Sequence, residues 1–205
     1  MCYNFNNKGV NLKKALKDLD AEVSDDTLTM NGDISAFAKK PIPAIINYKG
    51  IVMLNAFWGT KEKPDTPTKG KNLKSENFHT FYKNIEKNRC LIPATSYFEH
   101  KTISVVGRKT KAKLKHELFW KNKVQFYIAA LFDTYENGDL GFGLLTTLPN
   151  PVQAEIHNRM IITLDAKKGK EFLLQNPIEE FQFPEYSPNL EAINLEEIKK
   201  PNTLF

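Results

Sequence analysis

The strongest constraint on the fold is a hairpin pattern in the second half of the chain. Residues 117–135 are rich in aromatic and β-branched side chains, as strands are. The pair Asn137–Gly138 follows, and this dipeptide favours the tight turns that join antiparallel strands. Residues 141–147 (GFGLLTT) then form a second strand, which Pro149 ends. The chain is therefore expected to build a sheet.

Further strand patterns flank this hairpin. Residues 42–58 are expected to form two strands around a Lys49–Gly50 turn. Residues 89–100 indicate a strand, a break at Pro93 and a second strand, and residues 159–164 indicate one more. Strands are therefore expected along most of the chain.

Short helices are expected between these strands. Residues 11–20 carry leucine and alanine at helical spacing, and residues 75–88 suggest a second helix with Ser75 as its N-cap. Residues 151–158 suggest one short helix or turn, and residues 167–175 another helix. Together these elements predict a strand-dominated α+β fold.

Length and composition fit one domain. The 205 residues are 41% hydrophobic and 26% charged, which suffices for a substantial core. Residues 1–205 are therefore expected to form a single domain, with a partly irregular tail from about residue 177. The two cysteines and four histidines show no paired ligand spacing, so neither a metal site nor a cofactor is expected.

The charge balance favours an anionic partner. The net charge of +5 weakly indicates nucleic acid. Residues 60–75 are expected to form an exposed basic loop of the kind that often carries function, and Arg108–Lys115 a solvated loop. Residues 1–20 hold no apolar signal segment, and no run approaches the roughly 18 apolar residues of a membrane span. A cytoplasmic protein is expected.

Cys2 directly follows the initiator methionine, and removal of Met1 would leave a cysteine at the N-terminus. The pKa of an α-amine is about 7.7–8.0, against about 10.4 for lysine, so part of it is unprotonated near neutrality. Such an amine attacks an aldehyde, and the neighbouring thiol then adds to the imine and closes a thiazolidine ring. A lone cysteine can also arise by chance, so this chemistry requires supporting residues.

Three further segments carry polar residues suited to such chemistry. Glu99, among aromatic side chains, is either an exposed edge residue, which the pattern favours, or a buried acid–base group with a raised pKa. His157 and Arg159 are either a proton shuttle beside a phosphate clamp or ordinary surface residues.

The third segment ends the basic loop. Asn72, Lys74 and Glu76 alternate there, and in an extended chain all three would share one face. Asparagine offers a donor and an acceptor, and lysine offers a charge for phosphate.

In this order, the segments resemble one family. They are Cys2 after the methionine, Phe57–Trp58–Gly59, Asn72–Glu76, Arg89–Glu99, Thr146–Thr147 and His157–Met160. Between residue 2 and about residue 165 the series resembles the SRAP domain of the SOS-response-associated peptidases, also described as abasic-site processing proteins. The resemblance implies a mixed or antiparallel barrel-like sheet with flanking helices. It also implies a monomer that binds single-stranded DNA, acts in DNA repair and stays associated with DNA in the cytoplasm.

The resemblance also implies a covalent activity, the capture of abasic sites as a thiazolidine DNA–protein crosslink. By this resemblance Cys2 is the nucleophile and Asn72 holds the opened sugar. Glu99 assists proton transfer, and His157 promotes opening of the sugar to its aldehyde. AP lyase cleavage and autoproteolytic removal of Met1 are implied as accompanying activities.

Lys74, Arg159 and Trp58 are the DNA-contacting residues that the resemblance implies. The chain departs from the family pattern at several positions. Tyr3 and Asn4 replace the usual Gly-Arg after the cysteine, and Lys74 replaces an arginine, which removes a bidentate fork.

Two other classes of function remain open from the residues. One is a cysteine peptidase or amidohydrolase that uses Cys2 with His157. The other is a single-stranded nucleic-acid-binding module without catalysis, which would bind DNA reversibly and form no crosslink.

Overall fold

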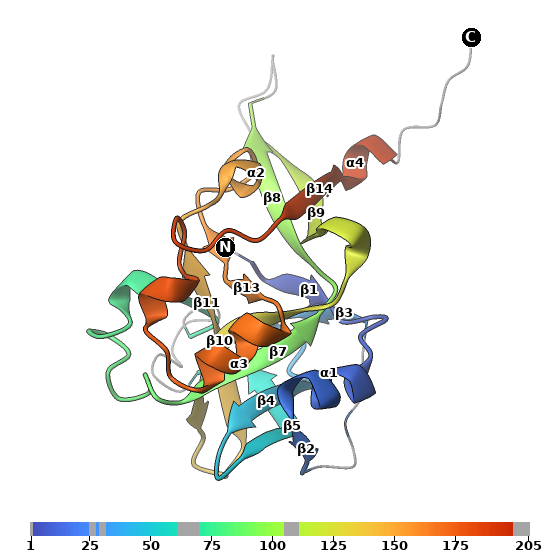
Figure 1. Cartoon of the computed structure of the whole chain (residues 1–205). Coiled ribbons are helices and arrows are strands. Elements are labelled where there is room, and N and C mark those ends of the chain that lie inside the picture. Colours follow the sequence, from blue (N-terminus) through green and yellow to red (C-terminus); the bar gives the residue numbers. More distant parts are fainter. Residues whose placement is uncertain (1, 25–27, 29–31, 61–69, 105–110, 199–205) are drawn as a thin grey trace.

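The computed structural model describes residues 2–24, 28, 32–60, 70–104 and 111–198 (Figure 1). Its strands are β1 (Asn4–Asn6), β2 (Glu22–Val23), β3 (Asp33–Ser35), β4 (Pro41–Asn47), β5 (Ile51–Trp58), β6 (Asn72–Lys74), β7 (Arg89–Ala94), β8 (Ser96–Ile103), β9 (Ala112–Trp120), β10 (Phe126–Thr134), β11 (Leu140–Thr147), β12 (Met160–Ile161), β13 (Thr163–Leu164) and β14 (Leu190–Asn194). Its helices are α1 (Leu12–Leu19), α2 (Pro151–Ala154), α3 (Ala166–Leu173) and α4 (Leu195–Ile198), with 3-10 turns η1 (Ser75–Asn77), η2 (Lys121–Lys123) and η3 (Ile178–Phe181).

Five strands close into a barrel. Antiparallel pairing runs from β5 through β4, β7 and β10 to β11. The strand β11 then returns to β5 in parallel, with Gly141 opposite Phe57 and Phe142 opposite Trp58. Closure satisfies the backbone groups that an open edge would leave exposed. The predicted strand-rich α+β fold with a barrel-like sheet is confirmed.

A second sheet carries the N-terminus of the chain. Its strand order is β14, β9, β8, β1 and β3, so β1 lies between β8 and β3. Phe5 of β1 stands opposite both Tyr97 of β8 and Ile34 of β3. In Figure 1, β8, β9 and β14 rise above the barrel, and β1 and β3 extend the same sheet across it. The start of β1, which follows Cys2 and Tyr3, is therefore held between β8 and β3.

The barrel strands β7 and β10 are buried on both faces. In β10, alternate residues Phe126, Ile128 and Ala130 point into the barrel, and Tyr127 and Leu131 point outward. The outward cluster packs under α1 and α3, which cover one side of the barrel in Figure 1. This burial explains the continuous apolar run of β10 in the sequence.

Several predicted elements are confirmed. The helix predicted at 11–20 is α1, with Asn11 as its N-cap, and 42–58 forms β4 and β5. The turn after Tyr135 joins β10 to β11, and Gly138 adopts a φ of 87° there. The helix predicted at 167–175 is α3, which begins one residue earlier.

The helix predicted at 75–88 is wrong. Only η1 is helical, and a series of turns follows it to residue 87. Ser75 does not cap it, because the N-cap is Lys74 and makes no side-chain hydrogen bond. Phe78 and Ile85 are nevertheless buried, so the apolar residues of this segment pack into the core through turns.

Other boundaries differ from those predicted. Pro93 does not break the strand but lies inside β7 opposite Tyr127, and the bend falls at residue 95. The run Arg108–Lys115, predicted as a loop, lies partly outside the described residues and partly in β9. Of the basic loop predicted at 60–75, residues 61–69 lie outside the described residues, and its end forms β6. The tail contains β14, which completes the second sheet against β9 and had no clear pattern.

Candidate active site

Cys2 lies two residues before the start of β1 at Asn4 and is fully buried. Its thiol donates a hydrogen bond to the Asn4 carbonyl oxygen, with a sulfur-to-oxygen distance of 3.1 Å. Burial, and then the nearby Glu99 carboxylate, raises the pKa of the Cys2 thiol. The thiol is therefore neutral near pH 7 and needs a base before it can attack.

The side chain of Asn72, at the start of β6, contacts Cys2. Its amide Nδ2 donates to the Cys2 carbonyl oxygen over 2.7 Å, between residues 70 positions apart in the chain. Its other polar atom, Oδ1, is buried and has no hydrogen-bond partner in the described part of the structure. A buried acceptor without a partner is costly, so this oxygen is suited to a donor on a ligand.

Parallel pairing with β11 holds Asn72 in this position. Leu144 of β11 stands opposite Asn72. Gly143 permits the approach, since a Cβ atom there would lie 2.7 Å from the Gly70 carbonyl oxygen and 2.8 Å from Leu73. The Trp58 indole N–H also donates to the Lys71 carbonyl oxygen over 2.9 Å. This hydrogen bond from the barrel residue Trp58 fixes the backbone of Lys71, the residue before Asn72.

Trp58 itself is a core residue, which corrects its assignment as a DNA contact. It is only 6% exposed. Its ring lies 5.1 Å from that of Phe5 and 6.1 Å from that of Phe142, measured between centroids. A ring enclosed in this way offers no face to a nucleobase. Trp58 supports the site through Lys71 instead.

Glu99 lies on β8 and is 3% exposed, so the exposed-edge interpretation favoured by its pattern is wrong. It shares a strand face with the buried Tyr97 and stands opposite His116 of β9. Burial raises the pKa of Glu99 from 4.5 to about 7, while the positively charged N-terminus of the chain acts in the opposite direction. A carboxyl group with this pKa both gives and takes a proton near neutrality.

His157 follows α2 and is half-buried. Its Nδ1 accepts a hydrogen bond from the backbone N–H of Arg159 over 3.1 Å, so the proton of the neutral ring belongs on Nε2. Burial, and then the positively charged N-terminus, lowers the pKa of His157. The imidazole is therefore neutral near pH 7.

Gln153 joins the two sides of the site, and nothing in the sequence distinguished it. The Tyr97 hydroxyl donates to Gln153 Oε1 over 2.9 Å, and Gln153 Nε2 donates to the Arg159 carbonyl oxygen over 2.8 Å. Asn150 caps α2 through the Gln153 N–H. The side chain is fully buried, so it positions the loop that carries His157 against β8.

Arg159 is engaged within the protein. Its guanidinium binds both carboxylate oxygens of Glu76, at 2.7 and 2.8 Å, and donates to the Thr146 carbonyl and hydroxyl oxygens. This bidentate pair ties η1 to β11. A phosphate at Arg159 would therefore have to share the guanidinium with Glu76. Lys74, in contrast, is exposed at the end of β6.

The structure places Asn72 and Glu99 beside Cys2, since Asn72 donates to its carbonyl oxygen and the Glu99 carboxylate raises the pKa of its thiol. His157 belongs to the loop that Gln153 joins to Tyr97 of β8. Within the described residues, no three His, Cys, Asp or Glu side chains are grouped to hold a metal ion. In that same part of the chain, no helix has the length and apolar character needed to span a membrane.

Comparison with known proteins places this arrangement in a family. The sequence profile described as SOS response associated peptidase (SRAP) matches residues 1–199. The chain belongs to the SRAP family. The resemblance inferred from the ordered segments between Cys2 and His157–Met160 is therefore confirmed at the level of the family.

Curated relatives in this family match over part of their length. The Abasic site processing protein YoqW of Bacillus subtilis (strain 168) is 31% identical over 98 residues, which are 46% of this chain and 42% of that protein. The Abasic site processing protein YoaM of the same organism is 32% identical over 98 residues, 45% of this chain and 40% of that protein. The match thus spans about two fifths of the length of these relatives.

Solved structures share the fold over nearly the whole chain. A crystal structure of a protein from Bacteroides thetaiotaomicron superposes with a TM-score of 0.71 at 19% identity, covering 98% of this chain and 95% of that one. A protein from Bordetella bronchiseptica gives 0.70 at 17% identity, covering 95% and 99%. These two proteins therefore share the fold of this chain at low sequence identity.

Proposed function

We propose that this protein captures abasic sites in single-stranded DNA through a covalent bond to Cys2, after Met1 is removed. The observation that carries the proposal is the convergence of a buried, titratable Glu99 and the amide of Asn72 on Cys2. Relatives with the printed name abasic site processing protein support the choice of substrate. An abasic sugar opens to an aldehyde, which is the electrophile that an N-terminal cysteine takes.

The reaction assigns a step to each nucleophile of Cys2. The α-amine attacks C1′ of the aldehyde and forms a carbinolamine, which loses water to give an imine. The thiol then adds to the imine carbon, and its proton passes to the imine nitrogen, which closes the thiazolidine. Glu99 takes a proton from the attacking amine and returns it to the departing hydroxyl, and its pKa of about 7 suits both transfers.

The other two polar residues act on the sugar. Asn72 Oδ1 is the buried acceptor without a partner in the described part of the structure, and it accepts a hydrogen bond from a sugar hydroxyl. His157, whose ring keeps its proton on Nε2, donates that N–H to the closed sugar and assists its opening to the aldehyde. An imine that does not cyclise undergoes β-elimination, so weak AP lyase activity accompanies capture. Met1 is removed in this proposal either autoproteolytically or by an aminopeptidase.

A cysteine peptidase or amidohydrolase is less well supported. Such enzymes activate cysteine as a thiolate by lowering its pKa beside histidine. Here burial and Glu99 raise the pKa of the Cys2 thiol, and burial lowers that of His157. Neither shift favours a thiolate–imidazolium pair, whereas an amine nucleophile with a neutral thiol is compatible with both.

The direct test is a denaturing gel. Protein with a free Cys2 amine is mixed with a single strand that contains one abasic site, and with the same strand undamaged. A denaturation-resistant adduct with the abasic strand alone is expected. Reversible binding without an adduct would support the non-catalytic binding module. Cleavage of a peptide or amide in the absence of DNA would support the hydrolase.

Non-covalent binding should depend on salt through Lys74. The logarithm of the binding constant should fall linearly with the logarithm of the salt concentration, and Lys74→Ala should reduce this slope by roughly 0.7. Affinity should fall equally for strands of different sequence. Arg159→Ala is the comparison, and because Arg159 binds Glu76 we expect it also to lower the melting temperature. An unchanged slope in Lys74→Ala would remove Lys74 from the DNA contacts.

A further inference from the structure

An exposed aromatic pair stands beside the nucleophile. The rings of Tyr3 and Phe37 lie 5.5 Å apart between centroids, with an angle of 38° between their planes. Phe37 is 51% exposed, which is unusual for a phenylalanine, and Tyr3 is half-buried. Neither residue takes part in the catalytic steps described above. A large aromatic side chain left in water next to a reactive residue is a candidate contact for a ligand.

The backbone ties this pair to the reactive residue. Tyr3 is the neighbour of Cys2, and its carbonyl oxygen accepts a hydrogen bond from the Ala36 N–H over 2.9 Å. Phe37 then lies in the turn that closes with the Ala38 N–H bound to the Ser35 carbonyl oxygen over 3.0 Å. Phe37 is therefore positioned relative to Cys2 by two short backbone links, and it does not sit on a long loop.

The two rings differ in exposure. Tyr3, next to Cys2 in the chain, is half-buried, and its ring contacts that of Phe37, which is 51% exposed. The aromatic pair thus extends from the residue beside Cys2 outward to solvent, and a ligand bound covalently at Cys2 would continue along it.

Positive charge flanks the same pair. The Lys71 ammonium lies 5.4 Å from the centroid of the Phe37 ring. It is held there by the carbonyl oxygens of Ala36 and Trp58. Lys39, two residues after Phe37 in the chain, is exposed, and its charge, after burial, lowers the pKa of Lys71. An aromatic face beside lysine charges suits a nucleotide, which joins a flat base to a phosphate.

We propose that Tyr3 and Phe37 form a stacking platform for the nucleobase adjacent to the abasic site, with Lys71 and Lys39 facing the phosphate that links the two nucleotides. This inference rests on the proposed function. It assigns the protein a contact with an intact base next to the lesion. Stacking of this kind accepts any base, because each has a flat π face, so it strengthens binding without imposing a sequence.

The test uses a strand that cannot crosslink. Each single strand carries one tetrahydrofuran abasic analogue. In the reference strand adenine flanks it on both sides, and in two further strands a second tetrahydrofuran replaces the adenine on the 5′ or on the 3′ side. Dissociation constants are measured with protein whose Cys2 amine is free. Removing the base on the stacked side should weaken binding to wild-type protein about tenfold. In Phe37→Ala this dependence on the neighbouring base should vanish. Phe37→Leu keeps apolar area but has no ring, so most of the dependence of the dissociation constant on the neighbouring base should disappear in this variant.

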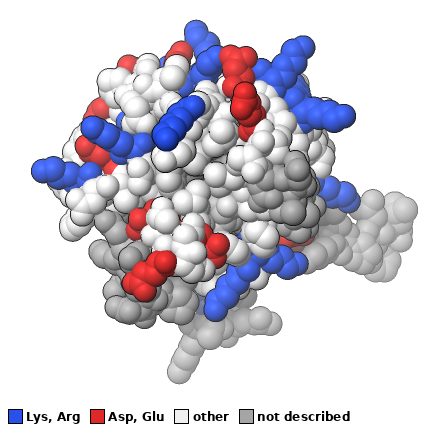
Figure 2. Space-filling view, turned by 90° about the horizontal axis from the view of Figure 1, so that it is seen from below, with Lys and Arg blue, Asp and Glu red and all other residues white. Residues whose placement is uncertain are grey.

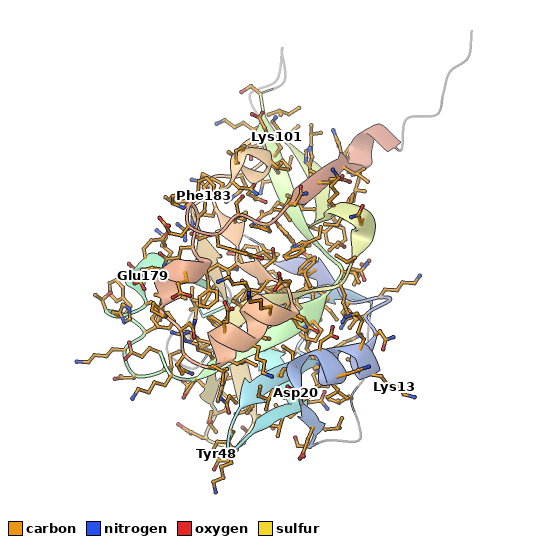
Figure 3. The ribbon with its side chains drawn as sticks, viewed as in Figure 1. Lys13, Asp20, Tyr48, Lys101, Glu179 and Phe183 are labelled. Carbon is orange, nitrogen blue, oxygen red and sulfur yellow. The ribbon has the colours of Figure 1, made fainter. Side chains whose placement is uncertain are left out.

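Tyr48→Ala is the matched control. Tyr48 is another exposed aromatic residue with a lysine beside its ring, since the Lys49 ammonium lies 5.6 Å from its centroid. It lies at the bottom of the barrel in Figure 3, on the turn between β4 and β5. Figure 2, seen from below, shows basic and acidic side chains interspersed on that side, without a continuous basic patch. Tyr48→Ala should therefore retain the wild-type preference for the adenine-flanked strand.

The outcomes separate this inference from the proposed function. A wild-type protein that crosslinks natural abasic DNA but binds both tetrahydrofuran strands equally would overturn the platform alone. So would a Phe37→Ala variant that loses affinity for both strands to the same extent, since its contact would then not involve the base. Failure of wild-type protein to crosslink any abasic strand would overturn the proposed function instead.

Discussion

Replacement of Cys2 by alanine is expected to abolish the stable adduct with abasic single-stranded DNA. The alanine retains an α-amine but has no thiol, so the imine cannot close to a thiazolidine and reverts in water. Cys2→Ser should leave an imine that borohydride traps, because a hydroxyl adds to an imine less readily than a thiol. A gel run with and without borohydride measures both species.

Two controls restrict this result to the N-terminal cysteine. Cys90 is the other cysteine of the chain, fully buried in the barrel, and Cys90→Ala should still form the adduct. A protein that keeps an N-terminal tag has a blocked amine and should fail as completely as Cys2→Ala. Normal crosslinking by the tagged protein would refute the mechanism, since the first bond forms at the free amine.

Glu99→Gln and His157→Ala are expected to slow crosslinking by about 10² to 10⁴, but at different steps. Glu99 transfers protons to and from the Cys2 amine and thiol, so its loss should slow crosslink formation on every aldehyde substrate and slow crosslink reversal more sharply. His157 assists ring opening, so the rate defect of His157→Ala should shrink when the substrate is already an open-chain aldehyde. Single-turnover time courses on natural and open-chain substrates measure this difference. Equal defects of both variants on both substrates would mean that the two residues act structurally.

The pH dependence provides an independent readout for Glu99. Because its pKa in the folded protein is about 7, the rate of crosslinking in wild-type protein should show an inflection near that pH, which Glu99→Gln should lack. Stability should change in the same variant. The folded protein keeps a proton that the unfolded chain releases between about pH 4.5 and 7, so the contribution of Glu99 to the free energy of unfolding decreases as pH rises through that window. Glu99→Gln should remove this decrease.

Local patterns gave a large part of the fold. The Lys49–Gly50 and Asn137–Gly138 turns, helix α1 and the strands β4, β5, β10 and β11 are all confirmed. Each depends on preferences of neighbouring residues, such as the positive φ of Gly138 or the alternation along a strand. Such preferences are written in a few consecutive residues, so a single sequence suffices to find them.

The errors arose where contacts distant in sequence outweigh local preference. Residues 75–88 have helical spacing, yet they form turns while Phe78 and Ile85 are still buried. Strand β14 had no clear pattern of its own, because it is defined by pairing with β9 some 70 residues earlier. Tertiary packing overrides propensities that differ by well under about 1 kcal/mol per residue.

The sequence by itself determined the family, whose profile matches residues 1–199, and the reactive side chains that the chain carries, among them Cys2 and Glu99. Their environments were decided only by the tertiary structure. Whether a side chain is buried, and how far its pKa moves, depends on the groups that surround it in space. Glu99 became a buried acid, and Trp58, expected at the DNA, became a core residue.

The same holds for the partners within the site. Asn72 meets Cys2 across 70 residues and Tyr97 meets Gln153 across 56, so no local pattern relates them. Folding brings such pairs together because closing the barrel and pairing β1 with β8 bury more apolar surface than any local arrangement allows. The sequence therefore determined which reactive groups are present, and barrel closure decided which of them meet.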